Sequence, residues 1–366
     1  MSIKMITNGN CLPHQSIVLV KEDNIGDFSL EKILAVYKLR QKEKLECPIW
    51  ELEVHPVDFC GLGCHGCSYA DRHSGIEINI EKLVQTIKYY EQYDLKTVFF
   101  SGGGDPCAWK GWRSFLNYVN DRKWKLGIST NLFDFSNLKN ILQEFDFLQI
   151  HIVGYDQESV FKETGVEAFD VLSNNHKSLF LRKNDGQLIT FKVLLRNQNF
   201  RQLGLFLDYI EMFDCDTVVI KMEQNFSGQN RVNEEIQLQT VRQIIQDHSI
   251  LNKFSYCIDN LDDIVFENPA PTQCYVANSG FYGLIRADGK IYPCVAGTYD
   301  ESNAYGHIGN KEEYINKKAC NGTYDWLMLS GLCPLRACRH YRFNSIIERY
   351  NKGEVFDKAY QMPTLL

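Results

Sequence analysis

The sequence predicts a parallel α/β fold with a cysteine-rich C-terminal extension. From about residue 48, short apolar segments alternate with amphipathic segments, and the alternation occurs six times. Strands that alternate with helices of this length pack as a parallel sheet with right-handed crossovers. Because six repeats are fewer than the eight of a closed barrel, we expect a partial (βα)6 TIM-like barrel with one open side.

Six segments have the apolar or alternating pattern of strands, and each is followed by a polar turn: 49–54, 97–100, 126–130, 147–154, 189–196 and 216–221. Helices are expected where apolar residues recur at helical spacing, namely at 78–93, 109–120, 201–213 and 234–248. A further short helix is expected between the third and fourth strands. The carboxyl ends of parallel strands meet at one edge, so the polar turns after them should form one site.

The pattern changes beyond the sixth strand. We expect an N-terminal extension at 1–47, the partial barrel at 48–225 and a bridging helical region at 226–270. A small cysteine-rich α+β domain is expected at 271–345, followed by a C-terminal tail at 346–366. In that domain, the dipeptide Asp288-Gly289 lies between two apolar segments and predicts a β-hairpin.

Composition and charge exclude several classes of protein. The formal net charge is −7 and no basic stripe occurs, so DNA is not expected as a partner. No apolar segment is long enough to cross a bilayer, and the N-terminus lacks the apolar core of a signal peptide. We therefore expect a cytoplasmic protein. In a reducing compartment, its 13 cysteines favour metal ligands, reactive thiols or buried apolar residues over disulfides.

Three cysteines, Cys60, Cys64 and Cys67, follow the first predicted strand with the spacing C-x3-C-x2-C. Thiolates suit zinc and iron–sulfur clusters. A structural zinc ion needs a fourth ligand, which His65 or His73 could supply. Alternatively, the three thiolates could hold three irons of a [4Fe–4S] cluster and leave the fourth iron open to a small molecule, unlike ferredoxin motifs with four cysteines.

This motif, placed after the first strand of a six-fold chain, resembles the radical S-adenosylmethionine (radical SAM) superfamily. The resemblance extends from about residue 50 to residue 345. It implies that S-adenosylmethionine (SAM) chelates the open iron through its amine and carboxylate. One electron then cleaves SAM to methionine and a 5′-deoxyadenosyl radical, which abstracts hydrogen from a substrate C–H bond. The family has an aromatic residue before the third cysteine; Gly66 occupies that position here, and Tyr69 is a conceivable substitute.

The resemblance also implies SAM-binding residues on later strands. Residues 101–106, Ser-Gly-Gly-Gly-Asp-Pro, resemble the family's GGEP motif, whose glycines let the backbone approach the methionine amine. His151 stands where the family has a serine that contacts the ribose, so it would face SAM or the substrate; a satisfied core histidine is the alternative. Arg196 would pair with the SAM carboxylate. The implied cofactor-binding residues are Tyr69, Ser101, Gly102, Gly103, Gly104, Asp105, Ser129, Asn131, His151 and Arg196.

The C-terminal cysteines form a second group. Cys274, Gly289 and Cys294 fit C-x14-G-x4-C, which resembles the opening of SPASM and twitch extensions. The resemblance implies one auxiliary [4Fe–4S] cluster on Cys274, Cys294, Cys333 and Cys338. Cys320 could replace one ligand or act catalytically as a thiol that donates a hydrogen atom. A zinc ribbon with four thiolate ligands is the alternative.

The substrate and the outcome of the reaction stay open. Twitch relatives generally process small polar metabolites, such as sugars, aminocyclitols or nucleotides, whereas full SPASM relatives mostly modify peptides. The cysteine count favours a small metabolite, and the segment before residue 48 is short for a leader-peptide-binding domain. A precursor peptide is the alternative substrate. Flavodoxin or ferredoxin would supply the electron, and a non-enzymatic iron–sulfur carrier or zinc scaffold is a remote alternative.

Overall fold

The computed structural model describes residues 4–7, 16–21, 28–29, 49–67, 69, 74–222, 234–254, 256–259, 274–279, 281–314, 341–353 and 361–362. The chain divides into two compact units. The cysteine-loop unit comprises Glu46–Ile189 and Ala277–Thr323. The terminal unit comprises Met1–Leu45, Thr190–Val276 and Tyr324–Leu366. None of the helices within the described residues is both long and apolar enough to span a bilayer.

The cysteine-loop unit is built on four neighbouring parallel strands. They are β4 (Glu51–Val54), β5 (Thr97–Phe100), β6 (Lys125–Thr130) and β7 (Phe147–Ile152). Val54 pairs with Phe100, and Phe100 pairs with Ile128, so the carboxyl ends of β4, β5 and β6 are in register. The loops that follow these strands therefore begin at one edge of the sheet.

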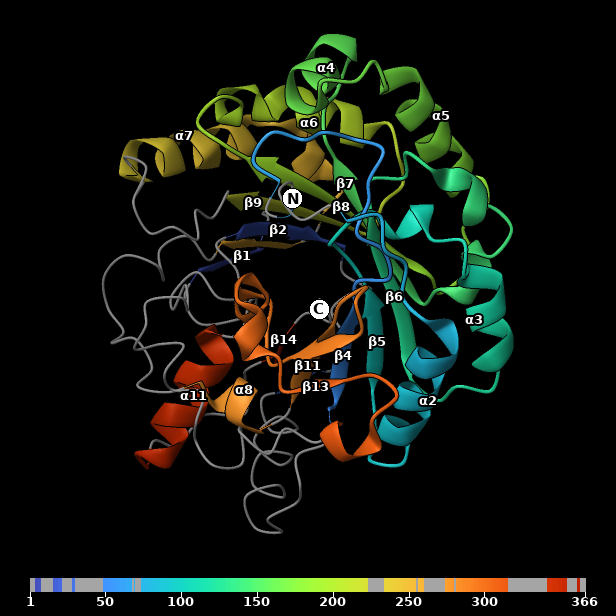
Figure 1. Ribbon diagram of the computed structural model, residues 1–366. Coiled ribbons are helices and arrows are strands. Elements are labelled where there is room, and N and C mark those ends of the chain that lie inside the picture. Colours follow the sequence, from blue (N-terminus) through green and yellow to red (C-terminus); the bar gives the residue numbers. More distant parts are fainter. Residues whose placement is uncertain are drawn as a thin grey trace. The chain divides into compact units, whose positions relative to one another are not determined.

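The described residues of this unit include the α-helices α2 (Ile80–Glu91), α3 (Trp112–Tyr118), α4 (Gln157–Thr164) and α5 (Phe169–Phe180). Figure 1 shows α2 and α3 beside β5 and β6. Asn79 starts α2, because its side-chain oxygen accepts a hydrogen bond from the main-chain N–H of Lys82 at 2.9 Å. The core between β5 and α3 is aromatic, with the ring centroids of Phe100 and Trp112 at 4.6 Å.

A C-terminal hairpin extends the sheet on the other side of β4. β11 (Tyr282–Ile285) pairs with β4 in parallel, and β12 (Lys290–Tyr292) pairs with β11 in antiparallel orientation. β13 (Gly306–His307) then pairs with β12. Gly289 has φ +84°, which a glycine adopts at no steric cost, and Asp288 precedes it in the turn. The predicted hairpin at Asp288-Gly289 is thus confirmed.

The terminal unit contains most of β8 (Leu188–Leu195) and has a mixed sheet. β8 pairs in parallel with β9 (Thr217–Met222). On its other edge, β9 pairs in antiparallel orientation with β2 (Ser16–Val20). β10 (Tyr256–Asp259) and β1 (Lys4–Thr7) continue this sheet. Its remaining elements include β3 (Phe28–Ser29), β14 (Gln361–Met362), α6 (Leu203–Glu211), α7 (Glu234–Asp247) and α11 (Tyr341–Asn351). The short helix α8 (Tyr275–Ser279) contains the boundary between the two units, after Val276.

The six expected strands are confirmed as β4 to β9, with ends that differ by up to two residues. In neither unit do the described residues form a closed barrel, in agreement with the expected partial one. The helix expected between the third and fourth strands consists of two 3-10 turns, η4 (Phe135–Asn137) and η5 (Leu142–Glu144). Strands β1, β2 and β10 were not expected, and the domain boundaries stay predictions.

Candidate cofactor site

The cysteine loop, residues 60–67, follows β4 at the edge where the carboxyl ends of the strands meet. Cys60, Cys64 and Cys67 form no disulfide, and all three have intermediate exposure. The main-chain N–H of Cys67 donates to the carbonyl of Cys64 at 3.2 Å, and Gly66 has φ +71°. The loop therefore makes a tight turn at the position where the family carries an aromatic side chain, and only glycine takes this conformation without strain.

Two contacts attach the cysteine loop to the segment that follows β7. The main-chain N–H of His65 donates to the carbonyl oxygen of Glu163 at 2.8 Å, and the ring Nδ1 of His65 lies 3.0 Å from the same oxygen. Leu62 is buried in a small apolar cluster with Val160 and Leu172. Because Leu62 lies between the first two cysteines, its burial holds this part of the cysteine loop against the apolar cluster.

The glycine loop, residues 101–104, packs directly on the stem of the cysteine loop, which is the segment 55–59 between β4 and Cys60. The N–H of Gly104 donates to the carbonyl of Val57 at 2.8 Å, and that of Asp105 donates to the carbonyl of Phe59 at 2.9 Å. A Cβ atom on Gly104 would lie 1.9 Å from the carbonyl oxygen of Phe59. A Cβ on Gly102 would lie 3.6 Å from the ring of Tyr69, an ordinary contact. Thus Gly104 is needed for packing of the two loops.

Asp105 is buried and joins the glycine loop to the end of β6. Its carboxylate accepts hydrogen bonds from the N–H of Cys107 at 2.8 Å, the hydroxyl of Thr130 at 2.6 Å and the N–H of Asn131 at 2.8 Å. Burial raises the pKa of this carboxyl group, and the three hydrogen bonds oppose that rise. An aspartate can make these short-range bonds because its carboxylate lies close to the main chain.

Cys60 has two hydrogen-bond donors directed at its sulfur. The main-chain N–H of Leu62 lies 3.4 Å from Sγ, and the side-chain amide of Asn131 lies 3.5 Å from it. Burial and the nearby Asp105 carboxylate raise the pKa of the Cys60 thiol to about 11, while these donors act in the opposite direction. A bound metal would displace the thiol proton, since thiolate is the ligating form.

The C-terminal hairpin supports the stem of the cysteine loop through a buried ion pair. Arg286 Nη2 lies 3.3 Å and 3.2 Å from the two carboxylate oxygens of Asp58, and both side chains are buried. Ser74 also donates to Asp58 at 3.2 Å. A Cβ on Gly103, whose φ is +117°, would lie 3.0 Å from the Asp58 carboxylate. The stem is therefore enclosed by the glycine loop and by the hairpin.

A second buried polar group lies on β4 and β11. Glu53 accepts hydrogen bonds from Tyr282 and from Nε2 of His55, which is 2.9 Å away. The rings of His55 and Tyr69 are nearly perpendicular, with centroids 5.4 Å apart. Burial and the charge of Glu53 raise the pKa of Tyr69 well above its usual range. Sequence reasoning missed Glu53 and His55, although polar residues at alternate positions of a buried strand could have indicated them.

The other sequence-predicted cofactor residues follow the strands in the expected order. Ser129 on β6 donates to Gln149 on β7 at 3.2 Å, and His151 is two residues beyond Gln149 with intermediate exposure. The N–H of Ser101 donates to the carbonyl of Val54 at 2.9 Å. Arg196 belongs to the terminal unit, is buried and directly follows β8.

Among the C-terminal cysteines, Cys274 and Cys294 lie within the described residues. Cys294 Sγ accepts a hydrogen bond from the N–H of Gly297 at 3.3 Å, just after β12. Cys274 belongs to the terminal unit, and its Sγ lies 3.5 Å from the amide nitrogen of Asn344. The other predicted cysteines, Cys320, Cys333 and Cys338, and the candidate zinc ligand His73 lie outside the described residues.

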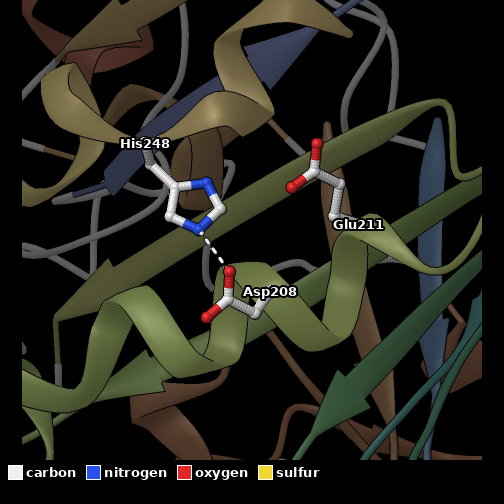
Figure 2. Close-up of side chains that lie close together, drawn as sticks. All are labelled: Asp208, Glu211 and His248. Carbon is white, nitrogen blue, oxygen red and sulfur yellow. Dashed lines mark hydrogen bonds and ion pairs between the residues drawn. The ribbon is translucent and has the colours of Figure 1, made fainter.

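One compact group of potential metal ligands was not predicted. Asp208 and Glu211 on α6 and His248 have ligand atoms within 4.8 Å of one another (Figure 2). His248 Nε2 lies 3.1 Å from Asp208 Oδ1, and its Nδ1 accepts a hydrogen bond from the N–H of Ile250 at 3.0 Å. Ser249 donates to Glu211 at 2.8 Å. Because both ring nitrogens are engaged, packing of the segment at 248–252 against α6 accounts for the group.

Comparison with known proteins identifies the family. Residues 54–204, which include all three loop cysteines, match the model of the Radical SAM superfamily. No curated protein matches the chain. The crystal structure of Streptococcus suis SuiB is similar at 16% identity and a TM-score of 0.58, covering 91% of this chain and 80% of SuiB.

Two further solved structures contain bound molecules. SuiB bound to precursor peptide SuiA matches at 15% identity and a TM-score of 0.61, covering 90% of this chain and 78% of that one. Native anSMEcpe with bound AdoMet and Cp18Cys peptide matches at 15% identity and a TM-score of 0.56, covering 84% of this chain and 100% of that one. At these identities, the likeness shows the fold. The chain therefore contains a radical SAM domain at residues 54–204, and its fold agrees with that match.

Proposed function

We propose that the protein binds a [4Fe–4S] cluster through Cys60, Cys64 and Cys67 and uses it to generate a radical from SAM. The observation that carries this proposal is the set of three partly exposed cysteines in one loop, none of them in a disulfide, within the segment that matches the family. Three thiolates would leave one iron open for SAM. The bound cluster would supply the electron that yields a 5′-deoxyadenosyl radical, which removes hydrogen from a substrate C–H bond.

The chain's own residues would position SAM beside the open iron. The main chain at 101–103 borders the cysteine-loop stem, which supports a contact with the SAM amine. We assign further SAM contacts to Ser129, His151 and Arg196 on the resemblance of their positions to the family's motifs. The Tyr69 ring lies beside Gly102 and His55, so its proposed role is to support the glycine loop by packing against it. The proposed electron donor is a flavodoxin or a ferredoxin.

We also propose one auxiliary [4Fe–4S] cluster on Cys274, Cys294, Cys333 and Cys338. The N–H groups directed at Cys274 Sγ and Cys294 Sγ support this assignment, because hydrogen bonds to sulfur stabilise the thiolate form that binds iron. A thiol role for Cys320 stays a prediction. Iron counts on a Cys294→Ala variant test the proposal, since four irons fewer than in the wild type are expected and an unchanged count would contradict it.

Two substrate classes have support. A small polar metabolite is favoured by the number of C-terminal cysteines, which fits one auxiliary cluster. A peptide is favoured by the solved structures of similar fold, since SuiB binds precursor peptide SuiA and anSMEcpe binds the Cp18Cys peptide. The fold likeness extends over most of the chain, so we give the peptide class at least equal weight. Stimulation of SAM cleavage by a synthetic peptide pool, or by a panel of sugars, aminocyclitols and nucleotides, separates the two.

The test of the cluster assignment is electron paramagnetic resonance (EPR) of the anaerobically reconstituted and reduced protein. We expect a [4Fe–4S]+ signal that changes shape when SAM is added, because SAM would bind the open iron. The Cys60→Ala/Cys64→Ala/Cys67→Ala variant should lose this SAM-sensitive signal and keep any auxiliary signal. Bound zinc with no SAM-sensitive signal would overturn the proposal.

A further inference from the structure

We propose that Asn131 tunes the reduction potential of the cluster held by Cys60, Cys64 and Cys67, through a hydrogen bond from its side-chain amide to the Cys60 sulfur. The inference deepens the proposed function and rests on it. The family resemblance counts Asn131 among the SAM-binding residues, whereas the structure directs its amide group at a cluster ligand. Asn131 would therefore act through Cys60 as a positioning residue.

The contact is well defined on both sides of the Asn131 side chain. Nδ2 lies 3.5 Å from Cys60 Sγ, and only 9% of Asn131 is exposed. The other side-chain atom, Oδ1, accepts a hydrogen bond from the N–H of Phe133 at 2.8 Å. An amide oxygen that is engaged by an N–H group fixes which end of the side chain is the donor. The NH2 group is therefore the one that faces the sulfur.

The backbone of Asn131 is held independently of the cysteine loop. Its N–H donates to the buried carboxylate of Asp105 at 2.8 Å, and the hydroxyl of Thr130 donates to the same carboxylate. Leu132, the next residue, has φ +62°, so the chain turns sharply just after Asn131. These restraints hold the amide in place before any cluster binds, which lowers the conformational cost of the N–H···S bond.

The effect on the cluster follows from charge. Reduction adds one electron, and part of the added negative charge resides on the sulfur ligands. A donor N–H group stabilises the more negative state more strongly, so N–H···S bonds raise the reduction potential. Leu62 supplies a main-chain donor to the same sulfur at 3.4 Å, but only the contact from Asn131 can be removed by changing a side chain. Loss of the Asn131 amide should therefore make the cluster harder to reduce.

The experiment is an EPR-monitored redox titration of the reconstituted full-length protein in the absence of SAM. Asn131→Leu keeps a similar side-chain size and removes the donor. Asn131→Asp keeps the oxygen that accepts from Phe133 and places an acceptor against the sulfur. The matched control is Asn137→Leu, because Asn137 donates its amide to the carbonyl of Cys107 at 3.0 Å in the neighbouring turn and contacts no cluster ligand.

We expect the equilibrium constant for reduction to fall about tenfold in Asn131→Leu, which lowers the midpoint potential of a one-electron couple by about 59 mV. The midpoint potential of Asn131→Asp should be lower still, and that of Asn137→Leu should equal the wild-type value. A residue that only binds SAM would not move a midpoint measured without SAM. The inference is overturned if both Asn131 variants keep the wild-type midpoint, or if both lose the cluster and so show a structural role. A wild type without a cluster on the three cysteines would instead overturn the proposed function, and the inference with it.

Discussion

The Gly104→Ala substitution tests whether the glycine loop holds the cysteine loop in place. An added Cβ would lie 1.9 Å from the carbonyl oxygen of Phe59 and 2.4 Å from its nitrogen. Both atoms belong to the backbone, so no side chain can move aside to relieve the overlap. The two loops must separate by more than about 1 Å to restore ordinary contact distances. We place the free-energy cost of this separation at the upper end of the usual range for overpacking, about 1–3 kcal/mol.

The separation would also break a main-chain hydrogen bond, that from Gly104 to Val57, which is worth about 1 kcal/mol. We therefore expect Gly104→Ala to lower the free energy of unfolding by about 4 kcal/mol. Because Phe59 directly precedes Cys60, the iron content should fall as well. Urea unfolding and iron analysis of the reconstituted protein measure the two effects.

Gly102→Ala is the matched control in the same loop. Its Cβ would lie 3.6 Å from the Tyr69 ring, and the stability should change by no more than about 0.5 kcal/mol. We expect Gly102→Ala to retain iron, while its affinity for SAM falls if the main chain here contacts the SAM amine. Equal stability and equal iron content in Gly104→Ala and the wild type would refute the packing argument.

Three further predictions concern stability. Burial lowers the pKa of His176 to about 3, below its ordinary 6.5, so the folded protein holds this ring neutral. The contribution of this neutral ring to the free energy of unfolding is complete above pH 6.5 and decreases as the pH falls, by about 2 kcal/mol at pH 5. Urea unfolding above pH 6.5 and at pH 5 should show this loss in the wild type and not in His176→Gln. Tyr282→Phe should cost about 2 kcal/mol in urea unfolding, because it removes a donor to the buried Glu53 carboxylate, and an unchanged midpoint would contradict that. Gly204→Ala should stabilise α6 by about 0.5 kcal/mol in thermal unfolding, since its Cβ would meet only Ile244 at 3.8 Å; a lower melting temperature would contradict this.

Local patterns in the sequence were sufficient for much of the fold. Residues 97–100 form a strand as expected because four apolar or β-branched residues occur in a row, and the last three of them are buried in the parallel sheet. The Asp288-Gly289 turn was predictable because glycine permits the positive φ that the hairpin requires. The three loop cysteines were recognisable from their spacing alone, before any three-dimensional contact was known.

Long-range contacts could not be predicted in this way. Strand β2 pairs antiparallel with β9, about 200 residues away, and nothing in its short apolar sequence specifies that partner. The same limit applies to Asn131, whose sequence position suggests a SAM contact although its amide faces Cys60. For Gly104, the sequence indicates a close backbone approach, but only the structure identifies Phe59 as the neighbour.

The most direct test of the radical SAM assignment is the formation of 5′-deoxyadenosine. The anaerobically reconstituted protein is incubated with SAM and dithionite, with the peptide pool and the metabolite panel each supplied, and the product is quantified by mass spectrometry. The account predicts 5′-deoxyadenosine from the wild type and none above background from the Cys60→Ala/Cys64→Ala/Cys67→Ala variant. Equal amounts from the two proteins, or none from an iron-loaded wild type with every substrate supplied, would contradict it.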